Sequence, residues 1–144
     1  MKRKKSFTLL VAIVLMLTSM STIFAASSTV TIPQLNYFVQ YSLSNNDTVE
    51  FKYTNLSATT QTAVFRITNA GYNDNSTSQV AGKLKGEYYL VYANGTSIKL
   101  GDISGSKLSG GIFNYLNQNA SLVVKLQNAQ GISQTGFKIK FDSQ

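Results

Sequence analysis

The stretch of sequence that decides the fold reads DTVEFKYTNLSATTQTAVFRITN, residues 47–69. Apolar and polar residues alternate on both sides of a short polar linker, residues 56–61, with Val64 as the one apolar residue on a polar face. The residues that share the two apolar faces are Val49, Phe51 and Tyr53 in the first half and Ala63, Phe65 and Ile67 in the second. This alternation is typical of β-strands with one buried face. Because the linker is short, the two strands are predicted to be antiparallel neighbours.

The same alternation continues along the chain, and the further strand candidates are residues 28–32, 35–43, 87–93, 96–100, 121–128 and 135–142. Asn94-Gly95 separates two of these candidates and predicts a β-hairpin with a type I′ turn, which needs positive φ at both residues. Residues 129–134 predict a second hairpin-like connection between the last two strands. The glycine-rich residues 101–111 predict a loop, and residues 112–116 fit either a strand or one helical turn.

Seven or eight short strands without a long amphipathic helix predict an all-β fold. The expected architecture is an antiparallel β-sandwich, loosely immunoglobulin-like, with a small β-barrel as the alternative. Residues 47–69 resemble a strand–turn–strand form that is common in bacterial immunoglobulin-like surface domains. In that form, V-x-F-x-Y-T-N and T-x-x-F-x-I-T-N strands flank a polar turn, and the resemblance implies the same architecture.

The N-terminus indicates export. Four basic residues lie at positions 2–5 and precede the almost wholly apolar residues 7–17, and a small residue, Ala25, ends the segment. This is the pattern of a secretory signal peptide, with an uncleaved anchor as the alternative. We predict a signal peptide over residues 1–25, an N-terminal arm or first edge strand over 26–34, and one β-sandwich domain over 35–144. The mature protein is then secreted, or retained noncovalently in the cell envelope.

The composition excludes several function classes. The chain has no Cys, His or Trp, so disulfides, thiol nucleophiles and histidine chemistry are absent. The net charge is +7, but removal of residues 1–25 leaves nine basic and six acidic residues, a net charge of +3 that does not predict a nucleic-acid partner. The acidic residues are spread along strands and loops, and no motif places two of them together. We therefore expect no enzyme activity, cofactor or metal.

Two surfaces are candidates for binding. Tyrosine is abundant, and an exposed tyrosine patch is typical of glycan and protein contacts; Tyr72, Tyr89 and Val91 are the candidate residues. Val30, Ile32 and Leu35 form a candidate assembly arm, because an N-terminal strand interrupted by Pro33 can pair with a neighbouring sheet edge. The expected partners are further copies of the chain or, as the alternative, a cell-surface glycan; the membrane is contacted only through the signal peptide. Lys138 and Lys140 share one face of the last strand and predict a protected edge, with an anion-binding stripe as the alternative.

Overall fold

The computed structural model describes residues 27–71 and 73–143, so the predicted signal peptide and Tyr72 lie outside the described residues. Nine strands occur in the described part of the chain: β1 (Ser27–Ile32), β2 (Tyr37–Ser44), β3 (Thr48–Thr54), β4 (Gln61–Asn69), β5 (Leu84–Val91), β6 (Ser97–Ile103), β7 (Ser109–Leu116), β8 (Ser121–Asn128) and β9 (Gln134–Asp142). Over those same ranges, no helix has the length and hydropathy needed to span a membrane.

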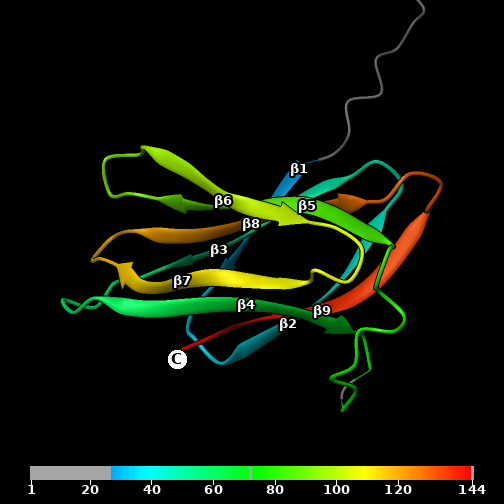
Figure 1. Ribbon diagram of the computed structural model, residues 1–144, viewed down its shortest axis with the longest axis horizontal. Coiled ribbons are helices and arrows are strands. Elements are labelled where there is room, and N and C mark those ends of the chain that lie inside the picture. Colours follow the sequence, from blue (N-terminus) through cyan, green and yellow to red (C-terminus); the bar gives the residue numbers. More distant parts are fainter. Residues whose placement is uncertain (1–26, 72, 144) are drawn as a thin grey trace, which may run out of the picture.

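The strands form two sheets that pack face to face (Figure 1). The first sheet has five strands in the order β1-β3-β8-β5-β6, and the second has four in the order β2-β9-β4-β7. Because β1, β6, β2 and β7 are open edges, the fold is a sandwich and not a closed barrel. The predicted all-β sandwich is therefore confirmed.

The core lies between the sheets and is built by the alternation seen in the sequence. Phe51 and Tyr53 of β3 point inward, as do Phe65 of β4 and Phe137 and Phe141 of β9. Aromatic rings join the two layers: Phe51 and Phe137 meet edge to face with their centroids 5.9 Å apart. Edge-to-face contacts of this kind stabilise a core beyond the area that they bury.

Two predicted pairings are wrong. The strands of residues 47–69 are not neighbours, because β3 pairs with β1 and β8 in the first sheet while β4 pairs with β7 and β9 in the second. The last two strands, β8 and β9, are likewise in different sheets. In both cases the short connection crosses the sandwich, so the apolar faces meet across the core and not side by side in one sheet. Alternation predicts which face is buried but not which sheet buries it.

Strand β1 departs from the antiparallel expectation, since it pairs in parallel with β3, from Ser27 beside Thr48 to Ile32 beside Tyr53. Strand β9 is not an edge, because it lies between β2 and β4. The prediction that Lys138 and Lys140 protect an edge is therefore wrong. Their side chains lie on the outer face of an internal strand.

The β5–β6 hairpin is confirmed, with a different turn. Only Gly95 takes a positive φ, 85°, while Asn94 does not. The Gly95 N–H donates to the Tyr92 carbonyl at 2.9 Å, and the Asn94 side chain accepts from the Thr96 N–H at 3.0 Å. This is a type I turn followed by a left-handed glycine, the usual longer hairpin loop. Residues 101–111 are only partly a loop, because β6 and β7 extend into them.

Candidate binding surfaces

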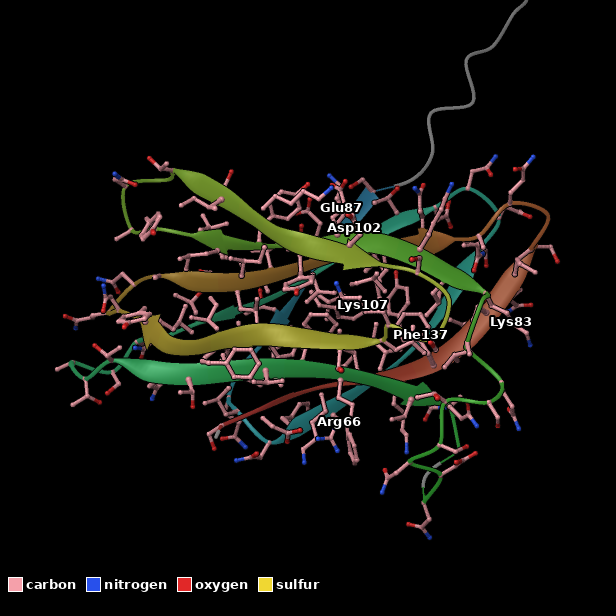
Figure 2. The ribbon with its side chains drawn as sticks, viewed as in Figure 1. Arg66, Lys83, Glu87, Asp102, Lys107 and Phe137 are labelled. Atoms are coloured by element: carbon pink, nitrogen blue, oxygen red, sulfur yellow. The ribbon has the colours of Figure 1, made fainter. Side chains whose placement is uncertain are left out.

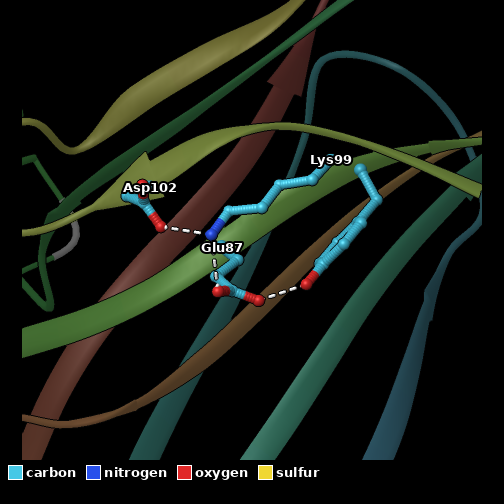
Figure 3. Close-up of polar contacts among 4 residues, drawn as sticks. Glu87, Lys99 and Asp102 are labelled. Atoms are coloured by element: carbon cyan, nitrogen blue, oxygen red, sulfur yellow. Dashed lines mark hydrogen bonds and ion pairs between the residues drawn. The ribbon is translucent and has the colours of Figure 1, made fainter.

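A polar network covers the outer face of the first sheet at β5 and β6 (Figure 3). The strand register places Glu87 beside Asp102 and Tyr89 beside Lys99. The Lys99 ammonium lies 2.7 Å from a carboxylate oxygen of Glu87 and 2.7 Å from one of Asp102. The Tyr89 hydroxyl donates to the other oxygen of Glu87. Figure 2 shows Glu87 and Asp102 together on this side of the sandwich.

These contacts keep Lys99, Glu87 and Tyr89 in their ordinary charge states at neutral pH. Hydrogen bonds to Asp102 and Glu87 raise the pKa of Lys99 above its ordinary value. The hydrogen bond from Lys99 lowers the pKa of Glu87, and the bond to Glu87 raises the pKa of the Tyr89 hydroxyl. None of these groups is poised to exchange a proton near pH 7, so the network has the electrostatics of a surface salt-bridge cluster.

The predicted tyrosine patch is only partly described. Tyr89 and Val91 lie two residues apart on the outer face of β5, and both are half-buried. The Tyr89 hydroxyl donates its proton to Glu87, so it could contact a ligand only as a hydrogen-bond acceptor while that bond is kept. Tyr72 lies outside the described residues. The use of Tyr72, Tyr89 and Val91 for binding stays a prediction.

The predicted arm lies along the edge of the first sheet. Ile32 is 2% exposed and belongs to the core, while Val30 and Leu35 are partly buried and pack against it. The remaining side chains of β1 are exposed. In addition to the backbone pairing of β1 with β3, the Ser28 hydroxyl of β1 lies within hydrogen-bond distance of the Tyr41 hydroxyl of β2, at 3.0 Å. The backbone of the arm therefore pairs with one neighbouring strand only, β3.

The sequence prediction missed a polar pocket on the outer face of the second sheet, which we call the Phe38 pocket. The lining residues are Phe38, Arg66, Thr68, Asn75, Lys140 and Asp142, and the cavity has a volume of about 110 Å³. They come from β2, β4, β9 and the β4–β5 loop. The two lysines of the last strand, one of which is Lys140, were the only signal in the sequence, as the alternative anion-binding stripe. Alternation places the strand residues outward, but only the strand order brings them together.

Apolar side chains are also exposed along the β6 and β7 side of the sandwich. Ile98 and Leu100 lie on β6, Phe113 and Tyr115 on β7, and Tyr92 at the β5–β6 turn. In residues 27–71 and 73–143, no three acidic, histidine or cysteine side chains gather where they could hold a metal ion.

Comparison with known proteins shows the fold alone. No protein-family model matches the sequence, and no curated protein is significantly similar to it. The structure is similar to PliG from Aeromonas hydrophila, a periplasmic inhibitor of g-type lysozyme, at a TM-score of 0.52 and 11% identity, over 84% of this chain and 100% of that one. It is also similar to the pre-peptidase C-terminal domain of a Bacillus anthracis collagenase, at a TM-score of 0.50 and 10% identity, over 85% of this chain and 100% of that one.

Proposed function

We propose that the chain is an exported, non-enzymatic surface or extracellular-matrix protein that assembles by exchanging strand β1 between copies. The signal-like N-terminus supports export, and the two proteins of similar fold are described as a periplasmic inhibitor and a domain attached to a collagenase. The observation that carries the assembly step is the attachment of β1. It is an edge strand, it pairs with β3 alone, and it is the one parallel strand among the described residues.

The connection after β1 suits such an exchange. Pro33 follows Ile32 directly and ends the strand, because proline has no N–H to donate to a ladder. Only residues 33–36 lead to β2 in the other sheet, and Asn36 holds a left-handed φ of 64°. Short connections that carry backbone strain favour domain swapping.

Exchange would conserve the contacts of the closed monomer. Departure of β1 uncovers the backbone groups along the edge of β3 and the buried site of Ile32. The β1 strand of a second copy carries the same residues in the same register, so it restores both. Strand addition to an open edge combines main-chain hydrogen bonds with side-chain pockets in this way.

A disulfide trap tests the exchange, since the chain has no native cysteine. Thr29 and Glu50 are register partners on β1 and β3. Adjacent strands are about 4.8 Å apart, within disulfide range. Oxidised Thr29→Cys/Glu50→Cys protein, residues 26–144, is expected to form covalent oligomers on a non-reducing gel, because exchanged β1 strands join different chains.

The matched control is Lys52→Cys/Val123→Cys, which joins β3 and β8 inside one sheet. It should give bonds within a chain only. Light scattering on a variant lacking residues 26–34 provides the second measurement, and the loss of β1 should abolish oligomers. Bonds confined to single chains in the β1–β3 trap, together with oligomers that survive the deletion, would contradict the proposal.

A further inference from the structure

We propose that the Phe38 pocket binds an acidic saccharide, with the sugar ring against Phe38 and the oxyanion against Arg66. The pocket begins with a cross-strand row on the outer face of the second sheet. Phe38 of β2 is the register partner of Lys140 of β9, and Lys140 is in turn the partner of Arg66 of β4. An aromatic ring and two cations therefore lie side by side on three neighbouring strands. Figure 2 shows Arg66 directed outward from this sheet.

Positive charge is in excess around the row. Lys140 is paired with Asp142, with 2.6 Å between the ammonium nitrogen and a carboxylate oxygen. The Arg66 guanidinium makes no hydrogen bond or ion pair with any described residue, although Arg66 is the register partner of a second cation, Lys140. Like charges directly opposite on a sheet destabilise it. An oxyanion at the pocket would relieve this repulsion.

The guanidinium of Arg66 selects the kind of anion. It offers five N–H donors in a rigid fork that matches two oxygens of a carboxylate or a phosphate. Hydrogen bonds of this charge-assisted type are about twice as strong as neutral ones. The Asp142 carboxylate lines the same pocket, but it is paired with Lys140, and none of the described residues accepts a hydrogen bond from the guanidinium, so its donors are available to an oxyanion.

Phe38 supplies the second half of the recognition. Phe38 is 41% exposed as a residue, and the ammonium nitrogens of Lys138 and Lys140 lie 4.9 and 5.6 Å from the centroid of its ring. These cation–π contacts hold the ring in place beside the pocket. An exposed aromatic ring is apolar surface that a partner can cover, and aromatic rings are enriched where binding occurs.

The small volume of the pocket means that it encloses only part of a ligand. About 110 Å³ is well below the 300–1,000 Å³ typical of sites that enclose a whole small molecule. It accepts one charged group, while the rest of the ligand lies on the open face of the sheet. Thr68 and Asn75 line the same pocket and offer a hydroxyl and a carboxamide for sugar hydroxyls. A linear chain of sugars that carry carboxylate or phosphate groups fits this arrangement.

Binding is tested by NMR titration of the protein, residues 26–144, with three sugar probes and, separately, with inorganic phosphate. Tetragalacturonate carries carboxylates, glucose 6-phosphate carries a phosphate, and maltotetraose is neutral. We expect shifts at Arg66 and at residues around Phe38 with at least one acidic probe and none with maltotetraose. The responding probe identifies the anion. Equal binding of the neutral probe, no response to either acidic probe, or equal binding of inorganic phosphate alone would overturn the saccharide assignment.

Variants distinguish binding in the Phe38 pocket from general attraction of anions to the positive charge of the protein. Arg66→Gln should weaken acidic-probe binding at least about tenfold, as loss of a charge-assisted contact does. Arg66→Lys keeps the charge but loses the fork, so we expect incomplete rescue, and Phe38→Ala should weaken the saccharide more than inorganic phosphate. Lys52→Gln removes one charge from the first sheet and is the matched control. Equal weakening by Lys52→Gln and Arg66→Gln would reduce the effect to bulk charge and overturn the proposal.

Discussion

The Tyr88 ring fills space in the core that two neighbouring glycines leave open. A Cβ added at Gly101 would lie 2.8 Å from the ring, and one added at Gly110 would lie 2.6 Å from it, so both glycines make room for Tyr88. The ring also packs edge to face on Phe65, with 5.0 Å between centroids. The ring is thus closed in by β6, β7 and β4.

Gly110→Ala is therefore expected to lower the free energy of unfolding by about 1–3 kcal/mol, the usual cost of overpacking a core. Urea denaturation measures it. Gly136→Ala is the control, because its nearest atom, the Ala70 Cβ, is at an ordinary 3.6 Å. The cost should shrink in a Tyr88→Leu background, where no ring opposes the methyl group. If Gly110→Ala lowered the free energy of unfolding by the same amount in that background, contact with the Tyr88 ring would not be the cause of the loss.

Asp74 makes stability depend on pH. Its carboxylate accepts hydrogen bonds from the Asn69 amide and the Ser76 N–H, both at 2.8 Å, and these lower its pKa to about 2. The folded-state pKa lies below the unfolded value of about 3.9, so the stabilisation is present above that value and is lost as the pH falls toward 2. Asp74→Ala should lower Tm at pH 6, and the difference from wild type should narrow between about pH 4 and pH 2. A Tm difference that does not change with pH would show that the charged Asp74 carboxylate is not the source of the stabilisation.

Buried asparagines fix the ends of the elements. Asn55, at the end of β3, is fully buried, and its amide donates to the carbonyls of Thr59 and Leu116 while its oxygen accepts from the Ser57 N–H. Asn69 has a similar role at the last residue of β4, where its side-chain oxygen accepts a hydrogen bond from the Gln79 N–H. The two T-N endings of residues 47–69 are thus the points at which loops are tied to the sandwich.

Asn55→Ala should cost about 1–3 kcal/mol in the free energy of unfolding, because it leaves buried backbone groups without a partner. Thermal melts and urea titration measure the loss. Asn94→Ala is the matched control, since Asn94 makes one comparable side-chain bond in an exposed turn. Equal losses for both variants would show that burial at the end of β3 is not the source of the stabilisation.

At the scale of elements, the sequence predicted the strands far better than their partners. Alternation located the inward face of Phe51 and Phe65, because a half-buried strand repeats every two residues. It could not tell that residues 56–60 cross between sheets, since a crossing and a hairpin place the same residues inward. The Phe38 pocket was missed for the same reason. Arg66 lies opposite the apolar face predicted by Ala63, Phe65 and Ile67, but only the strand order of the second sheet puts Lys140 between Arg66 and Phe38.

The chain crosses repeatedly between the two sheets, and these connections link the sheets covalently. Among the described strands, every connection except the β5–β6 hairpin joins one sheet to the other. The rings of the core follow the same plan, since Phe51 meets Phe137 and Tyr53 meets Phe141 across the layers. Neither sheet contains a long run of consecutive strands, so neither can bury its apolar face without the other.

Unfolding should therefore be one transition, even when the core is weakened. Phe137→Ala removes a fully buried ring that contacts Tyr41 and Phe51, and it should cost about 3–5 kcal/mol. Far-UV circular dichroism follows the strands, and tyrosine fluorescence follows the core in a chain without tryptophan. In urea, both signals should shift to a lower midpoint and still coincide. If the fluorescence changed at a lower urea concentration than the circular dichroism, the prediction would be wrong. A sheet would then persist after the ring contacts between the two sheets had broken.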